Sequence, residues 1–363
     1  MTATRRGVSP PPPRLKPRHL ITGNCIVLSI ILIAIAVGGW SVWRDYQQFL
    51  ITPFIAADQP ARVLNVPKGM NVRTLAQQLV SDQLMSHPHY FIALAYEHGK
   101  ARSIKAGEYA IAPGMVPRQL LDRIVAGQSI QYSVTFIEGW RYRDALAAIA
   151  RQPVFHSELS NQPAAIIAEK LGIDGDHPEG WLFPDTYYFQ RGMTDTVIVR
   201  RAHQKMQRVL AAEWALRQPD LPLKTPYEAL ILASIIEKET GLARERPAIA
   251  GVFIRRLRLG MKLQTDPTVI YGLGDEYTGN LRRADLERDT PYNTYTRRGL
   301  PPTPIALPGR ASLKAALKPQ DDGSVYFVAR GDGSHYFSKT LPEHQCAVRR
   351  YQLGMECDPR RYR

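Results

Sequence analysis

Residues 225–241 read TPYEALILASIIEKETG and predict a buried helix that ends in two acidic residues. The Thr-Pro pair supplies an N-cap and a first helical residue, and the final glycine is a common helix stop. The run between them is largely apolar, so this helix is expected to lie in a core. Its last turn carries Glu237 and Glu239, and either carboxyl group is a candidate for chemistry.

The two glutamates point in nearly opposite directions, because residues two apart on a helix are separated by about 200°. Glu239 shares its row with bulky aliphatic residues, and Glu237 shares its row with smaller ones. Bulky apolar neighbours desolvate a carboxyl group and raise its pKa, as a general acid at neutral pH requires. The pattern therefore favours Glu239, with a solvated helix end as the alternative interpretation.

Composition and charge limit the classes of partner. The chain has 363 residues, 44% of them hydrophobic and 22% charged, as in globular proteins, and its net charge is +14. A basic protein suits a polyanionic partner such as nucleic acid, anionic lipid or an acidic cell-wall polymer. The sequence has no zinc-finger spacing and no glycine-rich phosphate loop, so nucleic acid is not an expected partner. No metal-binding spacing such as H-E-x-x-H occurs, and no metal or other cofactor is expected.

Residues 25–43, CIVLSIILIAIAVGGWSVW, carry no charge and predict a transmembrane helix of about 28 Å. Positive side chains precede it in a proline-rich arm, residues 1–24, which places the N-terminus in the cytoplasm and the following domains outside. These residues are Arg5, Arg6, Arg14, Lys16 and Arg18. A cleaved signal peptide with a site near Ala36 is the alternative, but the apolar run continues past that site.

Residues 44–60 are expected to form a linker, and residues 61–130 a small α+β domain. The opening RVLNVPKGMNVRTLAQQLV predicts a strand, a Pro-Gly turn and a helix capped by Asn71, and the later AGEYAI predicts a second strand. These segments resemble a LysM module, which implies that this domain binds glycans; a generic small α+β domain is the alternative interpretation.

Residues 131–363 are expected to form one mixed α+β catalytic domain. A strand is predicted over 133–140, a helix over 143–150 and a long helix over 195–217. Between them lies an aromatic block that suits either a saccharide platform or a buried hairpin: Trp181, Phe183, Tyr187, Tyr188 and Phe189. Cys346 and Cys357 could form a structural disulfide in an exported domain, but the sequence leaves this pairing open.

Several blocks resemble the endolytic murein transglycosylases of the YceG-like family. They include ASIIEKET, the Glu245-Arg246 pair, LQTDPTVIYG, PYNTY, GLPPTPIALPG and SHYFSKTLPEH, and the similarity covers nearly the whole chain. This resemblance implies that Glu239 is the catalytic acid, in agreement with its helical face. The chain departs from the family pattern at Arg255, where asparagine is usual, and at Thr303, where glycine is usual.

The family resemblance implies cleavage of the bond between N-acetylmuramic acid and N-acetylglucosamine without water. The C6 hydroxyl of the sugar serves as nucleophile, so one carboxyl group suffices and the product is a 1,6-anhydromuramyl end. Asp266 precedes a proline and suits either a turn and helix cap or a direct role in the cleft. The candidate substrate-binding residues are Gln264, Thr265, Asp266, Tyr271, Tyr292, Asn293 and Tyr295.

The sequence thus predicts an α+β protein of the cell inner membrane with a single transmembrane helix and a periplasmic catalytic domain. Peptidoglycan strands are its expected substrate, and peptidoglycan synthases are possible partners implied by the resemblance. Two alternatives remain open. One is a murein-binding scaffold without catalysis, and the other is a hydrolytic muramidase in which a carboxylate such as Asp266 activates water.

Overall fold

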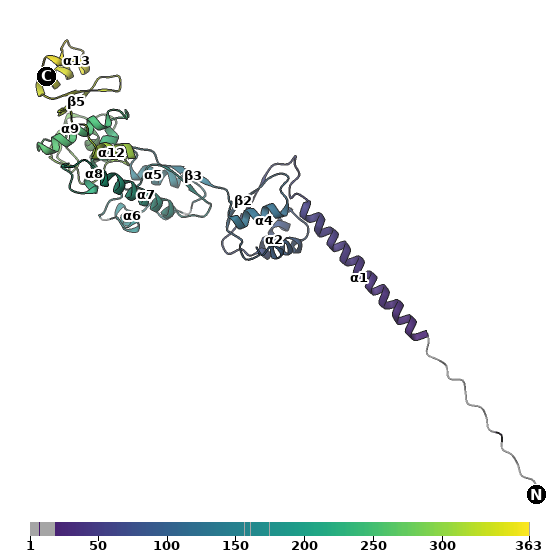
Figure 1. Ribbon diagram of the computed structural model, residues 1–363. Coiled ribbons are helices and arrows are strands. Elements are labelled where there is room, and N and C mark those ends of the chain that lie inside the picture. The colour runs from purple at the N-terminus through teal and green to yellow at the C-terminus, as the bar shows by residue number, and fades with distance from the viewer. Residues whose placement is uncertain (1–6, 8–18, 156, 160, 174, 363) are drawn as a thin grey trace, which may run out of the picture. The chain divides into compact units, whose positions relative to one another are not determined.

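The computed structural model describes residues 7, 19–155, 157–159, 161–173 and 175–362 (Figure 1). The fold is mixed α+β, as predicted. Its contacts divide the chain into two compact units, Met1–Ile130 and Gln131–Arg363.

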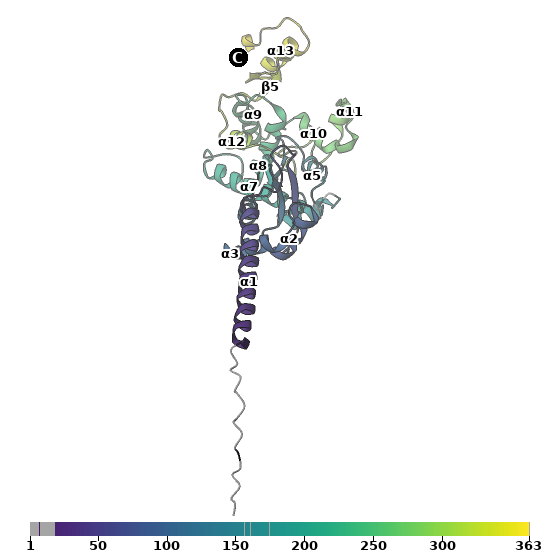
Figure 2. The same cartoon turned by 90° about the vertical axis from the view of Figure 1, so that its right-hand side faces the viewer.

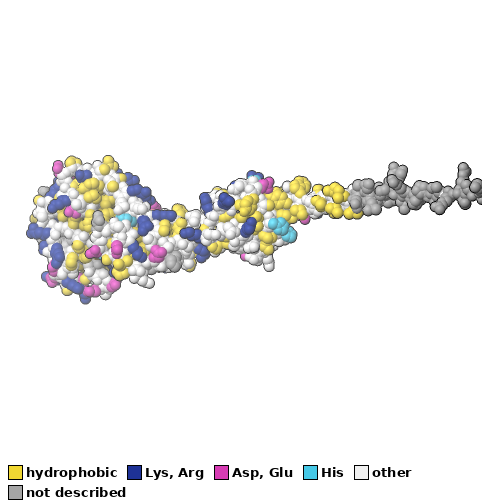
Figure 3. Space-filling model, turned by 90° about the horizontal axis from the view of Figure 1, so that it is seen from below, with side chains coloured by type: hydrophobic (Ala, Val, Ile, Leu, Met, Phe, Trp, Pro, Cys, Tyr) yellow, Lys and Arg dark blue, Asp and Glu magenta, His cyan; other side chains and the backbone are white. Residues whose placement is uncertain are grey.

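The first unit begins with a long helix, α1 (His19–Ile51), which is compatible with a membrane anchor. Within the described residues, one helix is long and apolar enough to cross a membrane, over Val27–Ile51, and its apolar window is not buried in the protein. Figure 3 shows hydrophobic side chains covering this helix, and Lys and Arg side chains spread over the visible face of the larger unit. The basic residues that predict the orientation, Arg5, Arg6, Arg14, Lys16 and Arg18, lie outside the described residues.

Two strands and three helices complete the first unit. In chain order they are β1 (Arg62–Val66), α2 (Val72–Ser81), α3 (Pro88–Glu97), β2 (Gly107–Ile111) and α4 (Pro117–Ala126). β1 and β2 pair antiparallel. The predicted cap is confirmed, since the Asn71 side chain accepts hydrogen bonds from the backbone N–H groups of Arg73 and Thr74, both at 3.0 Å. A core of buried aliphatic and aromatic side chains lies between the helices and the strand pair.

The structure corrects the expected linker at residues 44–60. α1 continues to Ile51, and the side chains of Phe49, Leu50 and Phe54 pack against the core of the first unit. Ile55 is 3% exposed and belongs to that core. Most of this stretch is therefore part of the folded unit, because its apolar residues have a core beside them in which to be buried.

The second unit is mainly helical, with two antiparallel strand pairs, β3–β4 and β5–β6. Its elements are β3 (Tyr132–Thr135), α5 (Tyr142–Ala150), α6 (Ala164–Leu171), β4 (Thr186–Phe189), α7 (Asp195–Ala215), α8 (Pro226–Glu239), α9 (Arg246–Arg258), α10 (Asp266–Leu273), η1 (Gly274–Glu276), α11 (Arg283–Glu287), α12 (Arg310–Leu317), β5 (Tyr326–Ala329), β6 (His335–Ser338), α13 (Leu341–Gln352) and η2 (Pro359–Tyr362).

The aromatic block is mostly buried rather than an open saccharide platform, and its strand β4 pairs with the distant β3 instead of forming a hairpin of its own. Phe183, Tyr187 and Phe189 are each less than 10% exposed and belong to the core. Tyr188 points to the other face of β4 and is 63% exposed. This alternation follows from the strand's period of two, so the block is a buried core as one interpretation predicted, although the predicted hairpin is absent from the described residues 181–189.

The helix α8 lies at the centre of the second unit, beside α7, α9 and α12 (Figures 1 and 2). Every residue from 229 to 236 is buried, as the apolar run predicts. Ser234 is the polar exception, and its hydroxyl accepts a hydrogen bond from the Ile305 N–H at 2.9 Å. The helix ends at Glu239, followed by an extended Thr240, two residues before the predicted glycine stop.

A hairpin of β5 and β6 with α13 closes the C-terminal end of the second unit. Cys346 and Cys357 form a disulfide with their Cα atoms 5.5 Å apart, which resolves the pairing that the sequence left open. Glu343 is fully buried and accepts hydrogen bonds from the Tyr336 hydroxyl and the Lys339 N–H. α13 is thereby fixed to β6 by a buried carboxyl group as well as by packing.

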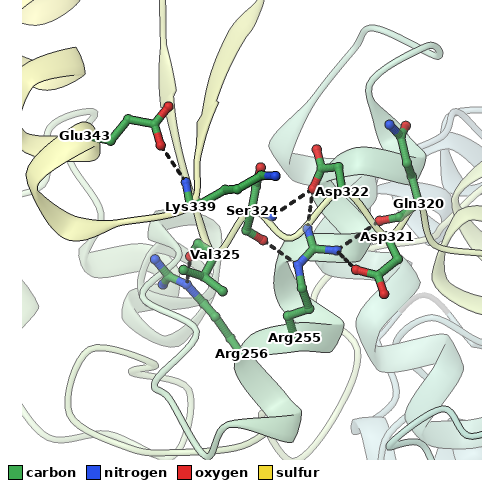
Figure 4. Close-up of polar contacts among 9 residues, drawn as sticks. All are labelled: Arg255, Arg256, Gln320, Asp321, Asp322, Ser324, Val325, Lys339 and Glu343. Carbon is green, nitrogen blue, oxygen red and sulfur yellow. Dashed lines mark hydrogen bonds and ion pairs between the residues drawn. The ribbon is translucent and has the colours of Figure 1, made fainter. Parts of the chain in front are cut away.

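The structure explains the two residues that depart from the family pattern, Arg255 and Thr303. Arg255 on α9 donates to the carbonyl oxygens of Ser324 and Gln320 and pairs with Asp321 and Asp322, so it ties α9 to the loop before β5 (Figure 4). Thr303 does not adopt a positive φ, so this position does not need glycine.

Candidate active site

Glu237 has a structural position. Its side chain is 4% exposed and pairs with Arg246 at 2.9 Å. Its second oxygen accepts a hydrogen bond from the Gly309 N–H at 2.8 Å. Both carboxylate oxygens are therefore used to join the end of α8 to the starts of α9 and α12.

Glu239 is placed differently, at the edge of a cavity of about 480 Å³. It is partly exposed, and its Oε1 accepts a hydrogen bond of 2.7 Å from the Thr265 hydroxyl. Burial raises the pKa of the Glu239 carboxyl, and the nearby Asp266 raises it further, against the hydrogen bond from Thr265 and the charges of His335 and Arg256. A carboxyl with a raised pKa that faces open space can hold a proton and deliver it.

The cavity walls come from segments far apart in the chain. Beside Glu239 stand Arg256 from α9, the 263–266 segment, Tyr295, and residues of β5, β6 and α13. The polar and aromatic side chains among these residues are Arg256, Gln264, Asp266, Tyr295, Tyr326, His335 and His344. Both carboxyl and cationic groups therefore face the same space.

The segment 264–266 is held in an unusual conformation beside Glu239. Gln264 has a φ of 52°, in a region that non-glycine residues seldom adopt. Thr265 is the N-cap of α10, yet its side chain does not cap the helix because it donates to Glu239. Asp266 is the first residue of α10 and not its cap, and its Oδ1 accepts a 2.6 Å hydrogen bond from the Tyr295 hydroxyl.

The structure brings only part of the predicted set together. Gln264, Asp266 and Tyr295 line the cavity with Glu239, and Thr265 lies directly behind it, 2% exposed. Tyr271, Tyr292 and Asn293 are not among its lining residues.

The three remaining side chains have other partners. Tyr271 and Tyr292 pack against each other with ring centroids 5.0 Å apart. Their hydroxyls bond to Glu179 and to Thr303, respectively. Asn293 is 1% exposed, and its amide donates to three backbone carbonyl groups of the 285–288 turn. Asn293 therefore shapes the loop that carries Tyr295.

Sequence reasoning did not identify Arg256, Tyr326, His335 and His344 as site residues. Arg256 lies in a run of basic residues from which the sequence does not single it out, although it is only 7% exposed. Its Nε and Nη1 atoms donate to the carbonyl oxygens of Val325 and Leu263, both at 2.7 Å. Within the described ranges, no group of three or more His, Cys, Asp or Glu side chains is arranged to hold a metal ion.

Comparison with known proteins places this chain in a family. Residues 64–350 match the sequence profile of the YceG-like family. The chain belongs to the YceG-like family. The endolytic murein transglycosylase of Bacillus subtilis is 30% identical over 323 residues, covering 84% of this chain and 89% of that protein. The protein of the same name from Streptococcus pneumoniae is 24% identical, covering 88% of this chain and 63% of its own length. A crystal structure of a YceG-like protein from Listeria monocytogenes matches with a TM-score of 0.51 and 29% identity, covering 78% of this chain and 98% of that one.

The hydrogen bond from Thr265 gives a prediction for this YceG-like chain. Thr265→Val removes the hydroxyl that lowers the pKa of Glu239, so Glu239 stays protonated to higher pH. The descending limb of the pH profile of kcat/KM is expected to move to higher pH. A hydrogen bond to a charged group contributes about 1.5 kcal/mol, so kcat/KM at the optimum pH is expected to fall by roughly tenfold. Thr265→Ser keeps the hydroxyl and should keep the limb in place; an unmoved limb in the valine variant would contradict this role.

A second buried carboxyl group, Glu179, contacts the helix α10 through Tyr271. It is fully buried, and it accepts hydrogen bonds from the N–H groups of Tyr142 and Gly180 and from the Tyr271 hydroxyl. Burial raises the pKa of Glu179 to about 7. Glu179 therefore links the start of α5, and the segment 179–182 that it begins, to α10.

Glu179 predicts a pH-dependent stability. In the unfolded chain the carboxyl loses its proton near pH 4.5, whereas in the folded protein it keeps the proton until about pH 7. The free energy of unfolding should therefore fall between these two values, by at most about 3 kcal/mol, and level off above them. Glu179→Gln should remove this slope and Tyr271→Phe should keep it, in denaturant unfolding followed by tryptophan fluorescence at several pH values. A slope that persists in the glutamine variant would assign it to other groups.

Proposed function

We propose that this chain cleaves the β-1,4 bond between N-acetylmuramic acid and N-acetylglucosamine within peptidoglycan strands, as a lytic transglycosylase. The observation that carries the proposal is Glu239, a carboxyl group with a raised pKa at the edge of an open cavity. The relatives from Bacillus subtilis and Streptococcus pneumoniae, both named endolytic murein transglycosylase, support the reaction class.

In the proposed reaction, Glu239 acts first as acid and then as base. It gives its proton to the leaving oxygen as the bond from that oxygen to C1 of the muramyl sugar breaks. The C6 hydroxyl of the same sugar then bonds to C1, and its proton passes to the Glu239 carboxylate. The acid is restored, no water is consumed, and the new end is a 1,6-anhydromuramyl group.

In this proposal, the neighbouring residues orient the Glu239 acid and bind the sugar. Thr265 orients the Glu239 carboxyl through its hydrogen bond. Gln264, Asp266 and Tyr295 line the cavity and offer polar groups to the substrate's hydroxyl and acetamido groups. Tyr295 also offers a ring face on which a sugar can stack.

Hydrolysis is the competing chemistry, because a second carboxyl group lies in the same cavity. Asp266 lines it together with Glu239, and two carboxyl groups could share the roles of acid and base for water. Hydrolysis would leave a reducing end, one water heavier than an anhydro end. A scaffold that binds murein without cutting it would produce neither end.

We further propose that α1 anchors the chain in the inner membrane, with the N-terminus in the cytoplasm and the remaining domains in the periplasm. The exposed apolar surface of α1 supports the anchor, and the positive residues before it support the orientation. The first unit has an antiparallel strand pair joined through two helices, and this arrangement supports the proposal that it is a LysM-like module that binds glycan. Association with peptidoglycan synthases in the same membrane would place the enzyme at newly made strands.

The test is mass spectrometry of muropeptides after incubating purified peptidoglycan with the full chain in detergent, in ¹⁸O-labelled water. New internal anhydromuramyl ends without the label are expected. Labelled reducing ends would assign the hydrolytic reaction instead. Binding to the polymer without new ends of either kind would favour the scaffold.

A further inference from the structure

A carboxylate and an imidazole form a close pair at the Glu239 cavity, which the imidazole of His335 lines. The Glu245 Oε2 and the Nδ1 of His335 are 2.8 Å apart. The other carboxylate oxygen, Oε1, accepts a hydrogen bond of 3.1 Å from the backbone N–H of His335. One carboxylate therefore forms hydrogen bonds with both the ring and the backbone of the same histidine, and these bonds fix the ring's orientation.

The pair is well shielded and joins two elements. The side chains are 12% exposed for His335 and 11% for Glu245. His335 begins β6, and Glu245 is the N-cap of α9. The Glu245 side chain makes no capping hydrogen bond, although an N-cap carboxylate would stabilise the helix there. The rings of Phe327 and His335 meet edge to face, with their centroids 5.4 Å apart. This contact is a second constraint on the orientation of the His335 ring.

This orientation leaves the second ring nitrogen for the cavity. An ionised carboxylate only accepts hydrogen bonds, so Nδ1 carries a proton and donates it to Glu245. Among the described residues, no partner bonds to Nε2, and His335 lines the cavity together with Glu239. The charge of His335 acts on Glu239, since it lowers the pKa of the Glu239 carboxyl.

We propose that the Glu245–His335 pair is a positioning element of the reaction, in which the His335 imidazolium compensates the negative charge that Glu239 acquires after giving its proton to the leaving oxygen. This inference rests on the proposed function. The carboxylate exists between the two proton transfers, and a fixed opposite charge in a shielded site stabilises such a species without reorganisation.

Other charged or titratable groups also face Glu239 and must be separated from the effect of His335. They are Arg256, Asp266, Tyr295, Tyr326 and His344. Arg256 is a second cation, but it is held by backbone carbonyl groups and does not depend on the pair. His344 stacks on Tyr326, and burial together with the charge of Arg256 lowers its pKa. His344 therefore favours the neutral form and is a matched control.

The test has one readout that does not depend on activity. The ¹³C chemical shift of the Glu239 carboxyl is followed against pH in the full chain in detergent, with the signal assigned by its absence in Glu239→Gln. His335→Gln removes the positive charge that lowers the pKa of Glu239, so its titration midpoint should move to higher pH. His344→Gln should leave the midpoint in place. A midpoint that stays unchanged in folded His335→Gln would overturn the proposal.

Kinetics provide the second readout. In His335→Gln, kcat should fall by about 10²-fold, the descending limb of kcat/KM should move to higher pH, and KM should change little. Glu245→Gln, which keeps the histidine, should shift the descending limb in the same direction. This variant replaces His335→Gln as the test if His335→Gln does not fold. A fall in rate without any movement of the limb would mean a merely structural role and would overturn the inference. If the wild-type chain cuts no peptidoglycan while the titration shift occurs, the proposed function fails and the electrostatic link stands.

Discussion

Glu239→Gln is expected to eliminate the formation of anhydromuramyl ends while the protein stays folded. The amide has nearly the shape of the carboxyl group and can still accept the Thr265 hydrogen bond, but it has no proton to give to the leaving oxygen. General acid catalysis contributes about 10²- to 10⁴-fold, and here the same group also serves as the base, so the loss should lie at the upper end. The rate is measured from muropeptide masses over time.

Glu237→Gln is the matched control, two residues away on the same helix. It removes half of the ion pair with Arg246 and weakens the contact to the Gly309 N–H. The free energy of unfolding should fall by about 1–3 kcal/mol, whereas the anhydro product should still form below the unfolding temperature. If the Glu237 variant lost the product and the Glu239 variant kept it, the assignment of the acid would be reversed.

The contrast between these two glutamates could be predicted from the sequence because both lie on one regular helix. Helical periodicity fixes which side chains share a face, so the row of Glu239 with Ile235 and Ile236 predicts apolar neighbours and the raised pKa of its carboxyl, although Glu237 is also largely buried. The long apolar helix α1 and the cap at Asn71 are equally local features, and both are present. These local predictions agree with the structure, whereas the strand expected over 133–140 is shorter, at Tyr132–Thr135.

The walls of the cavity could not be predicted in this way. Arg256, His335 and Tyr295 approach Glu239 from separate segments, and no periodicity relates their positions in the sequence. Tyr271 and Tyr292 flank the cavity residues in sequence, yet they pack together on another side of α10. Which face of a short helix meets a cavity depends on tertiary packing, which the local pattern does not specify.

The site also breaks the local rules from which such predictions are made. Thr265 and Glu245 occupy N-cap positions but direct their side chains toward Glu239 and His335 instead of capping their helices. Gln264 takes a positive φ where glycine would be expected. Departures from local preference are common where function determines the conformation, and these three lie together at or beside one cavity.

Gly251→Ala is expected to be the most destabilising small substitution in the second unit. A Cβ atom at this position of α9 would lie 2.0 Å from the backbone oxygen of Gln320, far inside contact distance. The loop cannot simply retreat, because the Gln320 N–H bonds to the Pro247 carbonyl at 2.9 Å and its oxygen accepts from Arg255. Overpacking of this kind costs about 1–3 kcal/mol and occasionally more, against roughly 1 kcal/mol gained in helix propensity. Thermal unfolding of the full chain in detergent measures the difference.

Gly241→Ala is the control for this substitution. It follows α8, does not have a positive φ, and a Cβ atom there would meet nothing within 4 Å, so it should be neutral or slightly stabilising. Gly251→Ala should in addition lower the rate of cleavage at temperatures where the protein is folded. The displaced loop leads into β5, and Arg256 holds β5 through the Val325 carbonyl while lining the cavity. A stable Gly251→Ala variant with full activity would show that α9 and this loop can separate without moving the wall opposite Glu239.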